Sequence, residues 1–345
     1  YVPKRLQKLL QNRVIEIEDS EFIESYLIND VLFRILNKVH CRDAFLVKSS
    51  FFQRQVLNDM RKASLLIGFD TSSWLILKNL KSDIPFILDQ TTPTAKLKKV
   101  YSDLVSAFNP GRPPFFFPYE ETELLRAHKI VVASTFSKKS ICDYYPINES
   151  KVVVNPYPVD FSFWTGSSAL TEQCLNFFYT GNITSNKGLG LLNAVWKKFS
   201  KEKKIRLNLI GTGDKKLIQT FCQYENVKYW GKLSRSDIKK LYQLGGVFVF
   251  PTYYDGFGFA LVEAMSCGLP VISTPNSIGG DLINDYQEGF LFPAGDMRAL
   301  EEYLAYFIKN QQQVVNMGEK AKRAVRLFNE KDYLERWKDS VLEIS

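Results

Sequence analysis

Two carboxylates, Asp255 and Glu263, lie eight positions apart around the expected start of a helix. A helix rises about 1.5 Å per residue, so they are at most roughly 12 Å apart, farther than the roughly 5 to 9.5 Å of paired hydrolase carboxylates. This separation suits a ligand with hydroxyl groups at both ends. A sugar and a ribose joined by a diphosphate have that shape. We expect Asp255 to bind the sugar and Glu263 the ribose, with the backbone N–H groups of Gly256, Phe257 and Gly258 near the phosphate or sugar.

A polar turn that runs from Gly181 and Asn182 to Lys187 and Gly188 joins an apolar strand to an amphipathic helix. Unpaired N–H groups and the helix dipole favour an anion at this place, and Lys187 adds a full charge that could meet a diphosphate. The turn is neither a Walker loop nor a G-x-G-x-x-G fingerprint. Taken alone, a solvated lysine is the commoner arrangement, just as a charge at a helix start is for each carboxylate.

Short β-branched and aromatic runs alternate with helix-length segments in two series, which predicts two doubly wound α/β domains with parallel sheets. A turn with Gly211 and Gly213 follows one strand, where the backbone could approach a ligand or simply make a tight connection. In such sheets ligands bind outside the carboxyl ends of the strands, and two facing domains would place both sets of ends along one cleft. The strands are expected at Val14–Ile17, Phe45–Val47, Leu65–Phe69, Phe86–Leu88, Ile130–Ala133, Val152–Val154, Asn176–Tyr179, Leu207–Ile210, Lys228–Trp230, Val247–Phe250, Val271–Ser273 and Phe290–Phe292.

The small-residue stretch 165–169 separates the two series and is interpreted as a linker. The expected domains are 1–165, 172–327 and a final helix over 328–345. That helix carries an apolar stripe of Tyr333, Leu334, Trp337, Val341 and Leu342, which must be buried against something.

The composition excludes several classes of protein. The 345 residues are 45% hydrophobic and 24% charged, which fits a packed globular chain rather than a disordered one. No apolar run approaches a membrane span. Five cysteines without a C-x-x-C pair argue against disulfides and a thiolate zinc site, so we expect a reducing, cytoplasmic setting. A net charge of +8 comes with no nucleic-acid motif, so no nucleic-acid partner is predicted.

The second half of the chain resembles the nucleotide-binding domain of retaining GT-B glycosyltransferases of family 4. The likeness rests on an ordered set of motifs. These are Gly181 with Lys187-Gly188, then Gly211-x-Gly213, then Asp255-x7-Glu263 ahead of Ala264-Met265-x-x-Gly268-x-Pro270-Val271, and finally Gly279-Gly280 and 289–293. The first half matches more loosely, at 120–134 and 152–160. The resemblance implies two Rossmann-like domains that face a central cleft, with the last helix crossing back to the first domain.

The resemblance also implies the activity. The chain would move a sugar, with retention, from a nucleotide diphosphate sugar to a hydroxyl of a glycan or lipid-linked acceptor, without a metal or other cofactor. Lys187 would stabilise the charge that grows on the diphosphate, Asp255 would contact the sugar, and Asp89, after a strand of the first domain, would contact the sugar or acceptor. Leu233 lies where relatives pack the base, although ordinary core packing also explains it. A helix cap or a turn explains Asp89 equally simply.

The chain departs from the family pattern in three places. Asn182 stands where the family has an arginine, and Asp255 is one methylene shorter than the family's glutamate. The strand and glycine-rich loop that open the family's first domain are not found, and the chain opens with Tyr1 rather than Met, so we expect part of the natural N-terminus to be missing. These departures keep two alternatives open: a noncatalytic nucleotide-sugar-binding partner subunit, and a GT-B sugar-nucleotide epimerase.

A basic cluster in the first domain suggests a further partner. Lys96, Lys98 and Lys99 stand near Arg112 and the run 115–117 of phenylalanines, and basic residues beside exposed aromatics dock on anionic lipid headgroups. Peripheral contact with the inner face of a membrane is therefore a hypothesis. A solvated helix face beside a buried aromatic run is the more ordinary interpretation.

Overall fold

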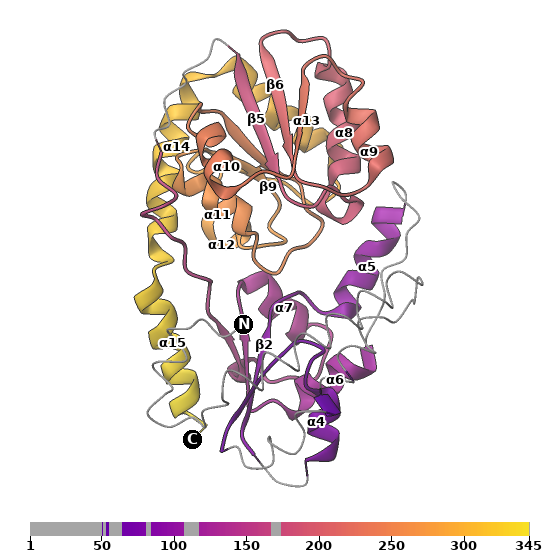
Figure 1. The fold of residues 1–345 in the computed structure, drawn as a ribbon, viewed down its shortest axis with the longest axis vertical. Coiled ribbons are helices and arrows are strands. Elements are labelled where there is room, and N and C mark those ends of the chain that lie inside the picture. The colour runs from indigo at the N-terminus through magenta and orange to yellow at the C-terminus, as the bar shows by residue number, and fades with distance from the viewer. Residues whose placement is uncertain are drawn as a thin grey trace.

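The computed structural model describes residues 50, 53–54, 64–80, 84–106, 117–166 and 174–344, which form two lobes, each built on a parallel sheet (Figure 1). The strands expected at 14–17 and 45–47 lie outside the described residues, as do Arg112, most of the phenylalanine run and residues 167–169 of the expected linker. The ten other expected strands are confirmed to within one or two residues at each end. The domain boundaries stay a prediction.

The N-terminal lobe contains a four-stranded parallel sheet in the order β1-β2-β3-β4. Its register places Leu66 beside Phe86 and Ile130 beside Val152. Apolar side chains alternate between the two faces of β2, so helices can cover both faces. The elements are β1 (Leu66–Phe69), α4 (Trp74–Asn79), β2 (Phe86–Gln90), α5 (Ala95–Ser106), α6 (Phe117–Arg126), β3 (Lys129–Val132), α7 (Thr135–Cys142), η1 (Glu149–Lys151) and β4 (Val152–Val154).

The C-terminal lobe contains a six-stranded parallel sheet in the order β10-β9-β8-β5-β6-β7. Counted from the first strand of this lobe and read from β7, the order is 3-2-1-4-5-6, that of a doubly wound dinucleotide-binding sheet. The order reverses between β5 and β8, so the crevice for a ligand is expected outside the carboxyl ends of these two strands. The elements are β5 (Leu175–Thr180), η2 (Ser185–Lys187), α8 (Leu189–Phe199), β6 (Ile205–Ile210), α9 (Lys215–Phe221), β7 (Val227–Gly231), α10 (Arg235–Tyr242), β8 (Val247–Phe250), α11 (Phe259–Ser266), β9 (Val271–Ser273), α12 (Gly279–Leu282), β10 (Gly289–Leu291), α13 (Met297–Lys309), α14 (Gln312–Ala324) and η3 (Val325–Leu327).

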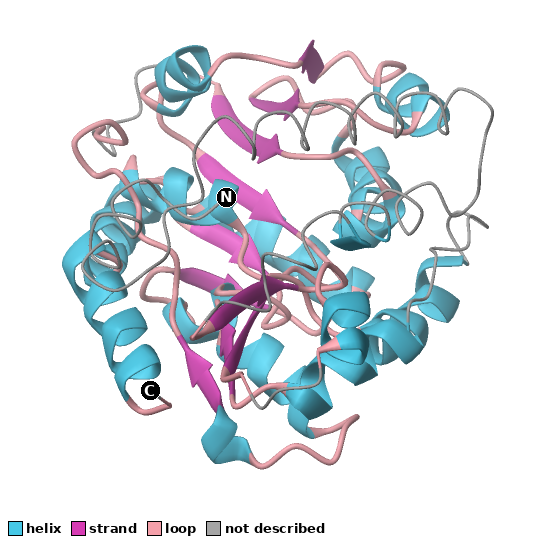
Figure 2. Ribbon diagram, turned by 60° about the horizontal axis from the view of Figure 1, so that its bottom comes forward, coloured by secondary structure: helices cyan, strands magenta, loops and turns pink. Residues whose placement is uncertain are grey.

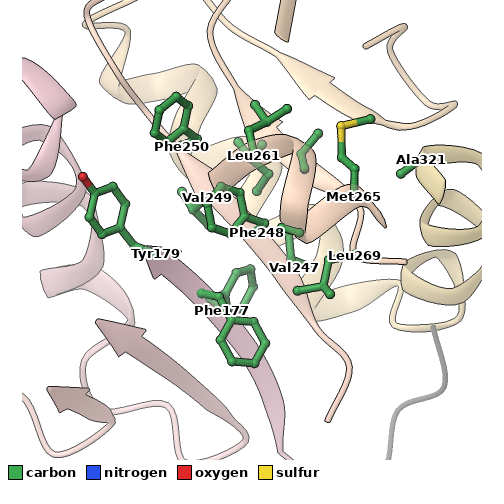
Figure 3. Close-up of a cluster of buried hydrophobic side chains, with 14 of the residues drawn as sticks. Phe177, Tyr179, Val247, Phe248, Val249, Phe250, Leu261, Met265, Leu269 and Ala321 are labelled. Carbon is green, nitrogen blue, oxygen red and sulfur yellow. The ribbon is translucent and has the colours of Figure 1, made fainter. Parts of the chain in front are cut away.

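Helices lie on both sides of the strands (Figure 2), so the central strands are apolar on both faces. β8 is buried along its whole length, and its side chains pack with Phe177 and Tyr179 of β5 and with Leu261 and Met265 of α11 (Figure 3). This burial makes β5 and β8 a rigid base for the turns that follow them.

The last helix, α15 (Glu330–Leu342), crosses back to the N-terminal lobe, as predicted (Figure 1). Tyr333 and Trp337 are buried in one cluster with Ile87 and Val131 of the first sheet. The cluster therefore holds α15, which follows the C-terminal lobe in the chain, against the N-terminal lobe. Leu342 was expected in the buried stripe, but its exposed fraction is 58%, whereas its neighbour Val341 packs against the cluster. At 3.6 residues per turn, Leu342 lies on the face of the helix opposite to Tyr333.

Candidate functional site

The turns after β5 and β8 lie against each other at the point where the strand order reverses. Gly188 ends the turn that carries Lys187 and begins α8, with a φ of 74°. A Cβ at this position would lie 1.8 Å from the carbonyl oxygen of Pro251, directly after β8. Glycine is therefore required both by the left-handed backbone and by the close approach of the second turn.

This packing brings Lys187 and Asp255 together. The ammonium Nζ of Lys187 lies 2.6 Å from Oδ2 of Asp255, and the two side chains are only 20% and 24% exposed. The other oxygen, Oδ1 of Asp255, accepts a hydrogen bond from the N–H of Phe257 at 3.2 Å, which orients the carboxylate at the start of the glycine loop. Direct contact between these two side chains was not part of the sequence prediction.

The N-terminal lobe closes against the same loop. A Cβ on Gly256 would lie 2.0 Å from the carbonyl oxygen of Thr91, and the hydroxyl of Ser134 donates a hydrogen bond of 2.8 Å to the carbonyl of Gly256. Gly258 has a φ of 99° and begins α11. The loop from Asp255 to Gly258 is thus part of the interface between the lobes, and the absence of side chains at Gly256 allows the approach.

The second glycine turn has a structural explanation. A Cβ on Gly211 would lie 1.9 Å from the carbonyl oxygen of Gly181, and one on Gly213 would lie 2.1 Å from that of Ile183. The turns after β5 and β6 therefore pack on each other, and this close approach accounts for the two glycines. Asn182 is exposed at the outer side of this contact, and a donor role for Gly181, Asn182, Gly211 and Gly213 stays a prediction.

Glu263 lies on α11, and its ion-pair partner is Arg235 rather than Lys187. The guanidinium of Arg235 lies 3.8 Å from Oε1 of Glu263 and stacks over the rings of Phe163 and Trp164 at 4.9 and 5.3 Å. Burial raises the pKa of Glu263 to about 7, and the positive charge of Arg235 opposes that rise. Leu233 is half-buried and packs against the core, and its contact with the base of the donor stays a prediction. A second charged cluster therefore lies apart from the Lys187–Asp255 pair.

Asp89 lies within β2 and not after a strand as expected, because the strand continues through Gln90. Burial, and then the negative charge of Asp70, raise the pKa of Asp89 to about 7, while a hydrogen bond with Tyr157 opposes the rise. The ring of Tyr157 also packs edge-on against Phe257 at 5.3 Å. Asp89 is thus joined to the glycine loop through Tyr157 and does not contact the Lys187–Asp255 pair directly.

The structure shows a polar network on the N-terminal lobe whose contacts the sequence analysis did not predict. The two carboxylate oxygens of Asp70 accept hydrogen bonds from the hydroxyls of Thr91 and Thr92 at 2.7 and 2.8 Å. Lys98 donates a hydrogen bond of 2.7 Å to the hydroxyl oxygen of Thr92. The available signal was the position of Asp70, Thr91 and Thr92 directly after two neighbouring parallel strands, whose carboxyl ends meet at one edge of a sheet.

The basic cluster on α5 is not a shared exposed face. The ammonium of Lys96 donates to the carbonyl of Tyr144 at 3.2 Å and lies 3.9 Å from the centre of the Tyr145 ring. Lys98 is half-buried at the network just described, whereas Lys99 is exposed. Membrane contact stays a prediction without support from this helix. Among the residues that the structure describes, no helix has the length and apolarity needed to span a bilayer.

Within the described ranges, the histidines, cysteines and acidic residues form no group of three that could hold a metal ion. Of the described cysteines, Cys142, Cys222 and Cys267 are free thiols.

Comparison with known proteins bears on the activity. Residues 161–324 match the family described as "Glycosyl transferases group 1", a segment that contains both turns of the Lys187–Asp255 pair. The chain is 27% identical over 196 residues to the O-antigen chain mannosyltransferase B of Escherichia coli, which covers 52% of the chain and 51% of that protein. The chain spans about half or less of the length of the first curated relatives it matches.

The solved structures extend the likeness to both lobes of the chain. The sucrose-phosphate synthase of Thermosynechococcus elongatus superposes with a TM-score of 0.73 at 17% identity, over 88% of this chain and 79% of that one. HepE of Anabaena, solved with UDP-glucose, superposes with a TM-score of 0.67 at 14% identity, over 85% and 82%. The fold is therefore GT-B, as predicted: two Rossmann-like domains with their strand ends toward each other.

Proposed function

We propose that the chain is a retaining glycosyltransferase that moves a sugar from a nucleotide diphosphate sugar to a hydroxyl of a glycan or lipid-linked acceptor. The observation that carries this proposal is the Lys187–Asp255 pair, which spans the point where the strand order reverses and faces the other lobe. An anion is favoured there by N–H groups at the starts of α8 and α11 and by the charge of Lys187. The match of residues 161–324 to the group 1 glycosyl transferases and the UDP-glucose bound by HepE support a nucleotide-sugar donor.

The residues have distinct roles in the proposed reaction. As the bond between the anomeric carbon and the phosphate oxygen breaks, the electron pair goes to the diphosphate, whose growing charge Lys187 and the helix-start amides stabilise. Asp255 orients the hydroxyls of the sugar. The acceptor oxygen forms the new bond to the anomeric carbon on the face that the diphosphate leaves, and the departing phosphate accepts the acceptor's proton. The charge is met by this chain's own groups, so no metal is required. Asp89 lies on the acceptor side, where its carboxylate positions the acceptor through the Tyr157 contact.

A thermal-shift screen against UDP-, GDP-, ADP- and CMP-sugars tests the proposal, because a ligand that binds the native state raises the melting temperature. One nucleotide should raise it in the parent and fail to do so in Lys187→Met. A panel of glycan and lipid-linked acceptors, with retention read from the anomeric signal of the product, then tests transfer. If no nucleotide sugar shifts the parent, the proposal is wrong. Release of nucleotide without transfer would favour an epimerase or hydrolase, and binding without turnover a noncatalytic subunit.

A further inference from the structure

Helix α5 of the N-terminal lobe is directed toward the C-terminal lobe and lies against η2, the turn that carries Lys187 (Figure 1). Tyr101 of α5 also contacts the C-terminal lobe, because its hydroxyl oxygen accepts a hydrogen bond of 2.9 Å from the side-chain amide of Asn276. The same ring lies 6.4 and 6.2 Å from those of Tyr253 and Tyr254, in the loop after β8. Lys98 precedes Tyr101 by three residues, and side chains at this spacing share a helix face. Lys98 is therefore on the face of α5 that meets the other lobe.

The ammonium of Lys98 is held by a neutral partner. Its hydrogen bond goes to Oγ1 of Thr92, whose own proton is given to Oδ2 of Asp70. An ammonium has three N–H donors. Within the described ranges, Thr92 is the hydrogen-bond partner of this ammonium, and no carboxylate lies within ion-pair distance of it. Lys98 thus keeps donor capacity for a group that enters the interface.

Lys98 and Lys187 come from different lobes but belong to one charged region. Burial lowers the pKa of Lys98, and the positive charge of Lys187 lowers it further, while the carboxylates of Asp70, Glu120 and Asp255 raise it. The backbone explains this proximity. A Cβ on Gly256 would lie 3.1 Å from Cα of Thr92, the hydrogen-bond partner of Lys98. Gly256 directly follows Asp255, the ion-pair partner of Lys187.

We propose that Lys98 is a second cation for the diphosphate of the donor, supplied by the N-terminal lobe from the side opposite to Lys187. The proposal rests on the proposed function. The charge of Lys187 disfavours the ammonium form of Lys98, and a diphosphate with two or three negative charges favours both ammonium groups and accepts a charge-assisted hydrogen bond from each. Because the two lysines come from different lobes, the bound diphosphate joins the lobes, and binding of the donor holds the interface closed.

The test compares Lys98→Met with Lys99→Met, a matched change at the next position of the same helix on an exposed side chain. Isothermal titration at one ionic strength measures the affinity for a nucleoside diphosphate and, by competition, for the corresponding nucleoside, with UDP and uridine or GDP and guanosine as the screen decides. Lys98→Met should lose roughly ten- to hundredfold in affinity for the diphosphate and nothing for the nucleoside, the value of a hydrogen bond to a charged group. Lys99→Met should bind both like the parent.

The outcomes separate the two claims. If the parent binds no nucleoside diphosphate, the proposed function fails. If the parent binds and Lys98→Met matches Lys99→Met, only the assignment of Lys98 is wrong. An equal loss for diphosphate and nucleoside would also overturn it, because the change would then act through the shape of the pocket. Lys98→Gln, which keeps a polar side chain of shorter length, gives the same comparison if the methionine variant fails to fold.

Discussion

The contact between Lys187 and Asp255 can be separated into a structural and a ligand-binding part by a double-mutant cycle. The variants are Lys187→Met, Asp255→Asn and the two together. The 2.6 Å contact joins side chains that are 20% and 24% exposed, so the pair is neither a surface salt bridge nor a fully buried one. Each single change leaves the other group without its partner in a region from which water is mostly excluded.

The magnitude follows from this intermediate burial. Exposed pairs contribute about 0 to 1 kcal/mol, and breaking a buried pair costs about 3 to 5 kcal/mol. We therefore expect each single variant to lower the free energy of unfolding by about 1 to 3 kcal/mol. The double variant removes both charges, so it should be about 1 to 2 kcal/mol more stable than the sum of the single losses predicts. Urea denaturation at one ionic strength measures these values.

Donor binding should behave differently. Lys187→Met removes a charge that the diphosphate requires, at an expected loss of roughly ten- to hundredfold in affinity. The double variant should recover stability without recovering affinity, because no charge has returned to the site. Titration with the nucleotide sugar that the screen selects measures the affinity, and Lys197→Met, an exposed lysine near the end of α8, is the matched control. Recovery of affinity along with stability in the double variant would refute the role of Lys187 in binding and leave the pair purely structural.

Three more results are expected. Glu263→Ala should weaken donor binding about tenfold while the fold stays intact. In the parent, the affinity for the donor should rise as pH increases through about 7, the raised pKa of Glu263, because ribose hydroxyls bind the ionised form. Glu263→Gln should flatten that rise, and a parent affinity independent of pH would contradict the ribose assignment. The pKa of Asp89 is raised to about 7, so the folded protein favours the protonated carboxyl below that pH. As pH rises from 4 to 7, the free energy of unfolding of the parent should therefore fall relative to that of Asp89→Asn by up to about 4 kcal/mol. Parallel pH profiles of urea unfolding for the two proteins would show that burial of Asp89 is not costly. Trp337→Ala should lower the free energy of unfolding by about 3 to 5 kcal/mol, because it leaves a cavity in the cluster between α15 and the first sheet. A loss below 1 kcal/mol in urea denaturation would mean that the packing of the crossing helix contributes little to stability.

The sequence was sufficient for the sheets because local pattern decides which segments form strands. Runs such as Val247–Phe250 are too short and too β-branched or aromatic for a helix and are buried on both faces, so they could be placed without knowledge of their neighbours. The turns with Lys187 and Asp255 could be placed for the same reason, since each follows such a run. The end of β2 was set too early, because Asp89 and Gln90 are polar and yet remain in the strand through pairing with β3.

What the sequence by itself determined is therefore the pair of doubly wound domains, a final helix with an apolar stripe and the loops that carry the charged residues. The crossing of that helix to the first lobe was implied by the family resemblance. The tertiary structure alone decided which charges meet: Lys187 with Asp255, Glu263 with Arg235, and Lys98 turned toward the interface. Hydrophobic period and turn chemistry act over a few residues of one chain segment. The partner of a charged side chain at the end of a strand depends on how two turns or two lobes pack, and the close approaches at Gly188 and Gly256 that allow these contacts are properties of that packing.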